Sequence, residues 1–367
     1  MFKWLEHRLK ELINWYLYFR YAAPKNLPLP IVNSSSKILF IRLNRIGDGL
    51  ITTPLISAVK TALNPTIHLL MDTGSEKAFL NNPHIDKKFK FQKKNSENTE
   101  SQGSSEHIIS LLAQENYDVV IDTHDDVSST VNYFITQLKP RFSFALKKEN
   151  HLLFTHTVGR AESSSTHVLA RVFALTALFG IKTSPPPICF EGHLSKKEQV
   201  KNQIDALLGI SGTKPLIGIN ISAGSEARFW GIEPYSLLIN LLRNYDCRII
   251  IIYDRRDVNH AQSIHDKTQV AISSWDDYSQ FAAAISLTDF LVTPDTQAIH
   301  LASAFSVPTF GLYVKYKTND MIWYPYATEF DCVITKEESL KNITFEEVKV
   351  KLLQLFHKVI YERKLHI

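Results

Sequence analysis

The sequence contains few cysteines, and their positions suggest neither a disulfide framework nor a metal site. The three present, Cys189, Cys247 and Cys332, lie far apart along the chain without metal-ligand spacing. Two of them fall in apolar runs, so we expect buried, reduced thiols in a cytoplasmic protein. Long hydrophobic runs are also missing, because none reaches the roughly 18 to 20 apolar residues of a membrane span. Charges interrupt the first apolar stretch, so the sequence shows no secretory signal.

A large excess of charge of one sign is absent as well. The formal net charge over 367 residues is +4, which predicts no nucleic-acid partner unless the charge gathers on one face. This mild excess is compatible with an acidic substrate or an anionic membrane surface. With 44% hydrophobic residues, the chain can fill a core, and its length predicts two domains rather than one.

The opening of the chain combines apolar and basic side chains at helical spacing. The apolar positions are Phe2, Trp4, Leu5, Leu9, Leu12, Ile13, Tyr16 and Phe19, and the basic ones among them are Lys3, Arg8, Lys10 and Arg20. Residues 1–36 therefore predict an amphipathic helix followed by a linker rich in proline and serine. Such a helix can lie in a lipid interface or dock on its own protein, and the pattern alone does not decide between the two.

Buried strands alternate with helices along most of the remaining chain. Strands are predicted at residues 37–43, 67–71, 117–122, 215–221, 247–253, 290–293 and 309–313, and helices at 54–63, 234–242, 281–287 and 300–305. A polar loop is expected at residues 93–106. The alternation is typical of parallel sheets wrapped by helices, and it restarts after the three prolines at 185–187. We therefore predict an α/β fold with two Rossmann-like domains at residues 37–190 and 191–335, followed by a helical segment at 336–367. Ligands of such sheets bind at the carboxyl ends of the strands, so the cleft between the domains is the expected site.

The first segment with chemical potential is a strand end followed by Gly47, Asp48 and Gly49. The two glycines predict a tight turn before the helix and leave the carboxylate of Asp48 open to a ligand. A carboxylate at a strand end that faces a cleft can act as a general base. The same aspartate can equally cap the following helix, which is its purely structural interpretation.

Two further strand ends carry groups suited to phosphate. Residues 222–230 supply small and hydroxyl residues and then Arg228, whose planar guanidinium can grip a phosphate. Asp295 and Thr296 begin a helix, whose free N–H groups and dipole attract a diphosphate. His300 lies about one helical turn further on. An ordinary polar loop, a capping aspartate and a packed histidine are the structural alternatives.

Motifs of other nucleotide-binding classes are absent. No Gly-Lys-Ser/Thr follows the first glycine turn, and no G-x-G-x-x-G follows a predicted strand, so a P-loop hydrolase and a Rossmann dehydrogenase are disfavoured. The second half has no Asp-x-Asp near a strand end, and the adjacent Asp276 and Asp277 are poorly placed to share one metal. A phosphate ligand bound there would then be neutralised by cations and backbone dipoles rather than by a metal ion.

In these three segments the chain resembles the bacterial heptosyltransferases of glycosyltransferase family nine. Residues 46–54 match the family's (I/L)GD-x-(V/L)-x-T-P signature, and residues 228–230 match its basic residue followed by x-W. Residues 295–304 match its D-(S/T)-G-x-x-H-x-A-x-A signature except at Gln297, which replaces the usual glycine. The resemblance runs from about residue 37 to residue 313. It implies a GT-B architecture, with an N-terminal acceptor domain and a C-terminal donor domain, and inversion at the anomeric carbon.

The resemblance also implies roles for individual residues. Asp48 would be the catalytic base, and Arg228 would neutralise the donor phosphates. The donor-binding candidates are Ser222, Ser225, Arg228, Asp257, Trp275, Asp276, Asp295, Thr296, Gln297 and His300, with Asp257 expected at the ribose and Trp275 and Asp276 at the adenine. The candidates for contact with an acidic acceptor sugar of the Kdo type are Arg42, Arg45, Lys139 and Arg141.

The sequence therefore predicts an inverting glycosyltransferase that transfers a heptose from ADP-heptose to a Kdo or heptose of the lipopolysaccharide or lipooligosaccharide inner core. No cofactor and no metal ion are expected. The expected partners are ADP-heptose, an acidic glycolipid acceptor and the inner leaflet, so we expect a cytoplasmic protein that is peripheral at the inner face of the cytoplasmic membrane. Two alternatives stay open. One is an enzyme of the same fold that uses another nucleotide sugar, either as a transferase or as an epimerase or hydrolase that recruits His300, Asp122 and Asp126. The other is a catalytically silent sugar-nucleotide-binding protein.

Overall fold

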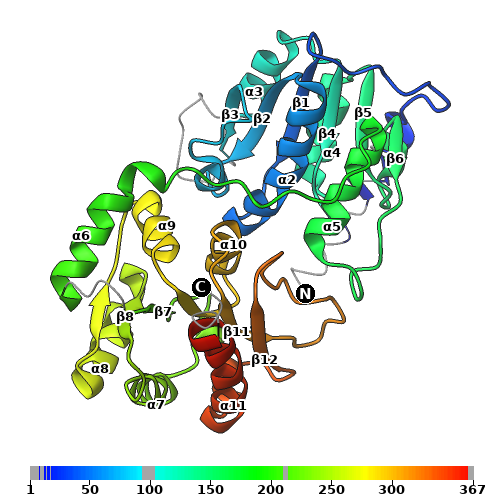
Figure 1. The fold of residues 1–367 in the computed structure, drawn as a ribbon. Helices are drawn as coiled ribbons and strands as arrows, with labels where there is room; N and C mark the ends of the chain where they lie inside the picture. Colours follow the sequence, from blue (N-terminus) through cyan, green and yellow to red (C-terminus); the bar gives the residue numbers. More distant parts are fainter. Residues whose placement is uncertain are drawn as a thin grey trace. The chain divides into compact units, whose positions relative to one another are not determined.

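The computed structural model describes residues 8, 12–13, 15–16, 18–92, 104–209 and 214–362, which belong to two compact α/β units (Figure 1). The first unit ends at Cys189 and the second begins at Phe190. The polar loop predicted at residues 93–106 lies largely outside the described residues, as do Trp4, Leu5 and Leu9 of the predicted helix. All three cysteines are free, with Cys332 buried and the other two half-buried. None of the described helices is long and apolar enough to cross a membrane.

The first unit is built on a parallel sheet of six strands in the order β3-β2-β1-β4-β5-β6 (Figure 1). The strands are β1 (Lys37–Arg42), β2 (Thr66–Asp72), β3 (Lys87–Phe91), β4 (Val119–Asp122), β5 (Phe142–Leu146) and β6 (His156–Val158). The helices are α2 (Ile46–Leu63), α3 (Ser105–Ala113), α4 (Ser129–Leu138) and α5 (Val168–Phe173), with shorter helical turns η1 (Glu76–Phe79), η3 (His151–Leu153) and η4 (Ala174–Phe179). Nearly all residues of β1 and β4 are buried, as expected of a parallel sheet covered on both faces.

The second unit repeats this plan with the order β12-β11-β10-β7-β8-β9. Its strands are β7 (Leu216–Asn220), β8 (Arg248–Ile252), β9 (Ala271–Ser273), β10 (Phe290–Pro294), β11 (Thr309–Val314) and β12 (Phe330–Thr335). Its helices are α6 (Lys197–Leu208), α7 (Ile232–Leu242), α8 (Val258–Thr268), α9 (Tyr278–Ser286), α10 (Gln297–Ala304) and α11 (Phe345–Phe356), with shorter turns η5 (Leu194–Lys196), η6 (Glu226–Arg228), η7 (Arg255–Asp257), η8 (Leu340–Asn342) and η9 (His357–Tyr361). The prediction of two parallel α/β units is therefore confirmed.

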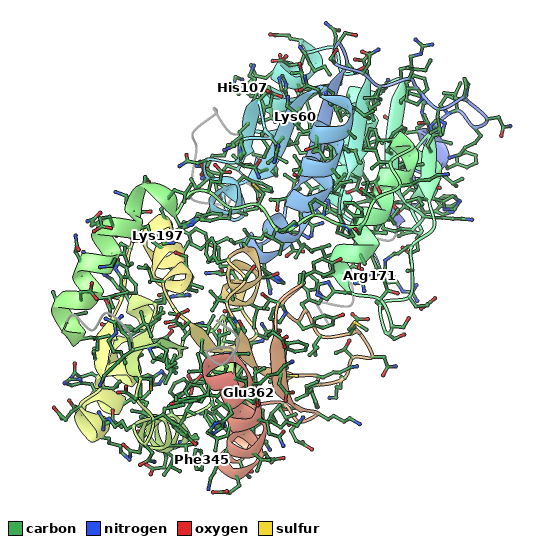
Figure 2. All side chains as sticks on the ribbon, in the orientation of Figure 1. Lys60, His107, Arg171, Lys197, Phe345 and Glu362 are labelled. Atoms are coloured by element: carbon green, nitrogen blue, oxygen red, sulfur yellow. The ribbon has the colours of Figure 1, made fainter. Side chains whose placement is uncertain are left out.

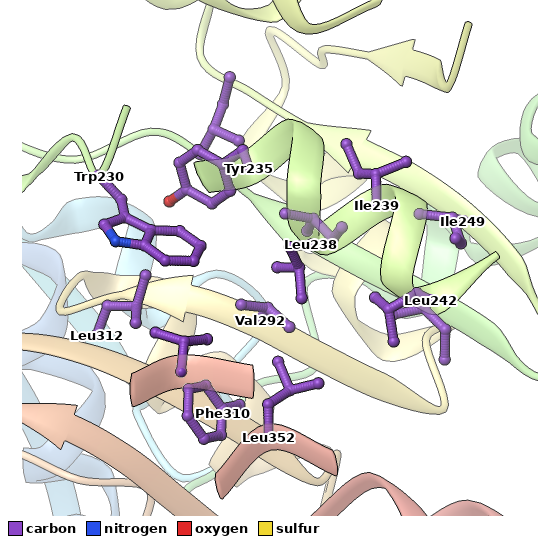
Figure 3. Close-up of a cluster of buried hydrophobic side chains, with 14 of the residues drawn as sticks. Trp230, Tyr235, Leu238, Ile239, Leu242, Ile249, Val292, Phe310, Leu312 and Leu352 are labelled. Atoms are coloured by element: carbon purple, nitrogen blue, oxygen red, sulfur yellow. The ribbon is translucent and has the colours of Figure 1, made fainter. Parts of the chain in front are cut away.

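The core of the second unit lies between its sheet and the helices α7, α8 and α11. Leu238 and Leu242 of α7 pack in one cluster with Val292 and Phe310 of the strands and Leu352 of α11 (Figure 3). The helical segment predicted at residues 336–367 thus contributes to the core of this unit through α11.

Both sheets have the same winding. Counted within each unit, the strand order is 3-2-1-4-5-6. The second and third strands are added on one side of the first strand, and the later strands on its other side. The switch points therefore lie between β1 and β4 and between β7 and β10. Open α/β sheets bind ligands beyond the carboxyl ends of the strands at such a switch point. We therefore expect ligand-binding residues after β1 and β4 in the first unit, and after β7 and β10 in the second.

Helix α2 begins at Ile46 rather than at residue 54, so the tight turn predicted for Gly47–Gly49 is wrong. The prediction took Pro54 as a helix start, but Pro54 lies inside the helix. A proline there has no N–H for the carbonyl of Leu50, four residues earlier. The hydroxyl of Thr53 donates to that carbonyl instead, at 2.8 Å, so the helix continues without an unsatisfied acceptor.

Gly49 is required by packing rather than by a turn. It lies buried in α2, and a Cβ added to it would approach Cβ of Ala78 in η1 to 2.5 Å. We expect Gly49→Ala to lower the free energy of unfolding by about 1 to 3 kcal/mol, because overpacking here outweighs the better helix propensity of alanine. Denaturant unfolding measures this, with Gly159→Ala as the control, since a Cβ on Gly159 meets no atom within 4 Å. Equal stability of the two variants would contradict this packing role.

Candidate active site

Arg42 ends β1 and is completely buried. Its Nη2 donates to Oδ1 of Asp48 at 2.7 Å, and its Nη1 donates to the backbone carbonyl of Thr123, just beyond β4. The side chain of Arg42 therefore joins the ends of β1 and β4 to the first turn of α2. These contacts lie at the switch point of the first sheet.

Asp48 does not cap α2, so the capping interpretation is wrong. The N-cap position is Arg45, which makes no side-chain capping bond, and Asp48 lies in the first helical turn. Its side chain is 14% exposed. It lines a cavity of about 390 Å³ together with Asn44, Arg45, Asp72 and Gly74. Arg42 holds one carboxylate oxygen of Asp48, and no described residue donates a hydrogen bond to the other.

A second buried cluster fixes the loop beside Arg42. Nζ of Lys148 donates to Oδ2 of Asp122 at 2.8 Å, and Nδ1 of His124 lies 2.8 Å from Oδ1 of Asp122. The backbone N–H of Leu43 donates to Nε2 of His124 at 3.0 Å, so the proton of a neutral imidazole sits on Nδ1. Burial alone would raise the pKa of Asp122, but Lys148 and His124 outweigh it and hold that pKa well below the usual range. Asp122 is thus a fully paired anion, poorly suited to the proton transfer that the epimerase alternative asks of it.

Two arginines form ion pairs with Asp125, the residue that follows His124 in the sequence. Arg171 of α5 (Figure 2) approaches Oδ2 of Asp125 to 2.7 Å, and Arg160, which follows β6, approaches the same oxygen to 2.8 Å. Burial opposes the charge on Asp125, yet the two guanidinium groups keep its pKa below the ordinary value. Sequence reasoning missed His124, Lys148, Arg160 and Arg171, because only the strand order shows that these segments are neighbours.

The four arginines and lysines predicted to bind the acceptor have different positions. Arg45 is exposed and lines the cavity beside Asp48, as an acceptor contact requires. The prediction for Arg42 is wrong, because its guanidinium is buried and engaged by Asp48 and Thr123. Lys139 and Arg141 precede β5 and so lie at the amino end of the sheet, opposite to the edge that carries Asp48. Their predicted acceptor contact is wrong for that reason.

In the second unit, the switch point is held by neutral groups. Nδ2 of the buried Asn220, at the end of β7, donates to Oγ1 of Thr293 in β10 at 2.8 Å. The backbone N–H of Ser222 donates back to Oδ1 of Asn220 at 3.2 Å. Thr296 caps α10 by accepting from the N–H of Ala298. Asn220 was missed because an asparagine at a strand end carries no distinctive sequence signal.

Arg228 connects the loop after β7 to the end of β10. Its Nη1 donates to the carbonyl of Asp295 at 3.0 Å, and its Nη2 lies 3.5 Å from Oδ2 of the same residue. The side chain of Arg228 remains 36% exposed, so it can still reach an anion. The fold thus gathers the sequence-predicted residues Ser222, Ser225, Arg228, Asp295, Thr296 and Gln297 at the carboxyl ends of two adjacent strands.

The other donor candidates lie on the outer strands of this edge or inside the unit. Asp257 stands at the N-cap of α8 after β8, and Trp275 follows β9 with its indole N–H bound by Gln203 at 3.0 Å. Asp276 pairs with Arg255 at 2.6 Å. His300 is only 3% exposed and its ring centre lies 6.0 Å from that of Trp323, which fits a packed helix histidine. Its predicted donor contact stays a prediction.

Comparison of the sequence with known families identifies one family. Residues 107–352 match the model of glycosyltransferase family 9 (heptosyltransferase), which is more than half of the chain. A Haemophilus influenzae protein, whose description as a glycosyltransferase is itself an inference, is 26% identical over 302 residues. That alignment covers 76% of this chain and 82% of the relative.

Solved structures share the fold over nearly the whole chain. A glycosyltransferase family 9 protein from Veillonella parvula has a TM-score of 0.73 and 18% identity, covering 90% of this chain and 99% of that one. ADP-heptose lipopolysaccharide heptosyltransferase II from Escherichia coli has a TM-score of 0.67 and 16% identity, covering 88% and 99%. These similarities show the GT-B fold that the sequence predicted. From its family match and its fold, this chain belongs to glycosyltransferase family 9, the heptosyltransferase family, and is a glycosyltransferase.

Proposed function

We propose that this enzyme transfers a heptose from ADP-heptose to an acidic sugar of the lipopolysaccharide or lipooligosaccharide inner core, with inversion at the anomeric carbon. The observation that carries the proposal is a pair of complementary half-sites at the two switch points. One presents the carboxylate of Asp48, held by Arg42, and the other presents Arg228 beside the N-terminus of α10. The structurally similar E. coli heptosyltransferase WaaC was solved with ADP and with ADP-2-deoxy-2-fluoro heptose, which supports an ADP-linked heptose as the donor.

In the acceptor half-site, Asp48 is the proposed general base. Arg42 holds one of its oxygens, which leaves the other to take the proton of the attacking hydroxyl. Arg45 is the proposed contact for the acidic group of the acceptor, because it is exposed beside Asp48 in the same cavity.

In the donor half-site, Arg228, Thr296 and the N–H groups of α10 are the proposed ligands of the diphosphate. Ser222 and Ser225 add phosphate contacts, and Asp295 and Gln297 adjoin the sugar. Asp257 is the proposed ribose contact, and Trp275 and Asp276 border the adenine, since β8 and β9 extend the same sheet edge beyond β7. In this arrangement, protein cations and dipoles stabilise the departing diphosphate, so we propose transfer without a metal ion.

The enzyme is proposed to work at the inner face of the cytoplasmic membrane, where a lipid-anchored acceptor would be found. Several described helical residues near the N-terminus leave their apolar side chains 47% to 81% exposed, namely Leu12, Ile13, Trp15, Tyr16 and Phe19. Tyr18 and Tyr21 of the same stretch pack against the core of the first unit. Tyr18 and Tyr21 therefore anchor this stretch on the protein, while the five exposed apolar side chains remain available to lipid.

A donor screen tests the proposal. Purified protein is incubated with ADP-heptose, ADP-hexoses and UDP-sugars in the presence of a truncated inner-core acceptor, and products are identified by mass spectrometry. We expect a glycosylated acceptor from ADP-heptose. Transfer only from another donor would overturn the heptose assignment. Donor hydrolysis or epimerisation without transfer would favour the epimerase or hydrolase alternative, and donor binding without turnover would favour a silent binding protein.

We expect Asp48→Asn to lower kcat by a factor of about 10² to 10⁴ while leaving the Kd for ADP close to wild type, because loss of a general base slows chemistry without touching the donor. Steady-state kinetics and calorimetry measure the two quantities. Asp126→Asn is the control, since Asp126 is a 91% exposed carboxylate of the same unit. Full activity of Asp48→Asn, or an equal loss in Asp126→Asn, would contradict the assignment.

Arg228→Gln should weaken ADP binding by about 1.5 to 3 kcal/mol, because a charge-assisted contact to phosphate is lost. Calorimetry with ADP measures the effect, and Arg243→Gln, on an exposed residue at the end of α7, is the control. Unchanged ADP affinity in Arg228→Gln would rule out its phosphate role.

Excess EDTA should leave transfer by the wild type unaffected, whereas a strict magnesium requirement would count against metal-free transfer.

A further inference from the structure

Lys139 and Arg141 border a second cavity of the first unit. It measures about 450 Å³, within the range of roughly 300 to 1,000 Å³ typical of ligand sites. The cavity lies where residues 21–27 meet the end of α4 and the start of β5. Its apolar lining includes Ala22, Ala23, Pro24, Leu27, Ile135 and Leu153. The site is therefore suited to hydrocarbon.

Basic side chains lie at and beside this cavity. The guanidinium carbon of Arg20 lies 5.6 Å from the ring centre of Tyr21, and Nζ of Lys139 lies 6.0 Å from the same ring. Tyr21, Lys139 and Arg141 all line the cavity. Arg20, Lys139 and Arg141 are exposed, and none has a carboxylate within 4.0 Å among the described residues. Three cations without a described acidic partner, beside an apolar cavity, match the chemistry of an anionic amphiphile.

The neighbouring helical residues extend this surface. Trp15 and Phe19 stack with ring centres 6.1 Å apart, and their side chains are 67% and 81% exposed. Aromatic rings and basic side chains together are typical of segments that lie at a membrane interface. Residues 12–20 thus lead directly into the segment that forms one wall of the cavity.

We propose that this cavity binds one anionic phospholipid of a membrane, with the phosphate at Arg20, Lys139 and Arg141 and the first part of an acyl chain among the apolar residues. The inference deepens the membrane location given under the proposed function, and it does not depend on the identity of donor or acceptor. The lipid site lies at the amino end of β5, whereas Asp48 follows the carboxyl end of β1 in the same parallel sheet. Membrane attachment and sugar transfer are therefore separable by mutation.

The test compares the full-length wild type with the double variant Lys139→Glu/Arg141→Glu. The control is Lys147→Glu/Lys182→Glu, which reverses two exposed lysines of the same unit that have no described ion pair. Binding is measured by sedimentation with phosphatidylcholine vesicles containing 30% phosphatidylglycerol, and by titration with monomeric dihexanoyl phosphatidylglycerol. We expect the Lys139/Arg141 variant to bind both probes at least about tenfold more weakly, because each basic residue near an anionic surface contributes to the attraction. The control should retain its binding of the short-chain lipid.

Equal losses of lipid binding in the two double variants would show that binding depends on net charge alone and would overturn the proposed site. So would failure of the short-chain lipid to bind more tightly than inorganic phosphate, or a concentration-dependent dimer that the Lys139/Arg141 variant abolishes, since a second copy would then occupy this surface. Transfer to a soluble, delipidated acceptor should be unchanged in the Lys139/Arg141 variant. If the wild type itself lacks transferase activity, the proposed function fails while the lipid-binding result still stands.

Discussion

The buried ion pair between Arg42 and Asp48 connects the fold of the first unit to its chemistry. An arginine side chain cannot shed its charge, so a buried guanidinium must be matched by an anion and by hydrogen-bond acceptors. Burial lowers the pKa of Arg42, and the charge of Asp48 opposes that shift. Asp48 and the carbonyl of Thr123 supply partners for Nη2 and Nη1 from α2 and from the end of β4, whereas Nε has no hydrogen-bond partner among the described residues. The position of the proposed base is therefore set by the same contacts that close the switch point.

In the second unit, different groups connect the two strands at the switch point. Its switch point is closed by the amide of Asn220 and the hydroxyl of Thr293, both neutral, and its arginine is left partly exposed. Around its switch point, the first unit neutralises buried and half-buried cations internally, through Asp48, Asp122 and Asp125. The second keeps Arg228 available for an external anion. This difference in electrostatics, on two sheets of identical winding, supports our proposal that the second unit binds the donor phosphates and the first carries the base.

Much of this arrangement could be predicted from the sequence, and the failures have physical causes. The buried strands and the three segments at strand ends are local patterns, and the structure places all three segments at switch points. The start of α2 was missed because Thr53 satisfies the carbonyl that Pro54 leaves open, an effect that proline statistics do not include. Lys139 and Arg141 were misassigned because the prediction used their charge alone. Both residues precede β5, so they lie at the amino end of the sheet. The cluster of Asp122, His124 and Lys148 depends on strand order, which periodicity does not specify.

The central claim is that Arg42 acts on the reaction only through Asp48. A double-mutant cycle on kcat/KM for transfer, with Arg42→Met, Asp48→Asn and the combination, tests this most directly. If Arg42 serves only to hold the base, the double variant will be no slower than Asp48→Asn alone. Losses that simply multiply in the double variant would show that the two residues act independently and would contradict this account of the site.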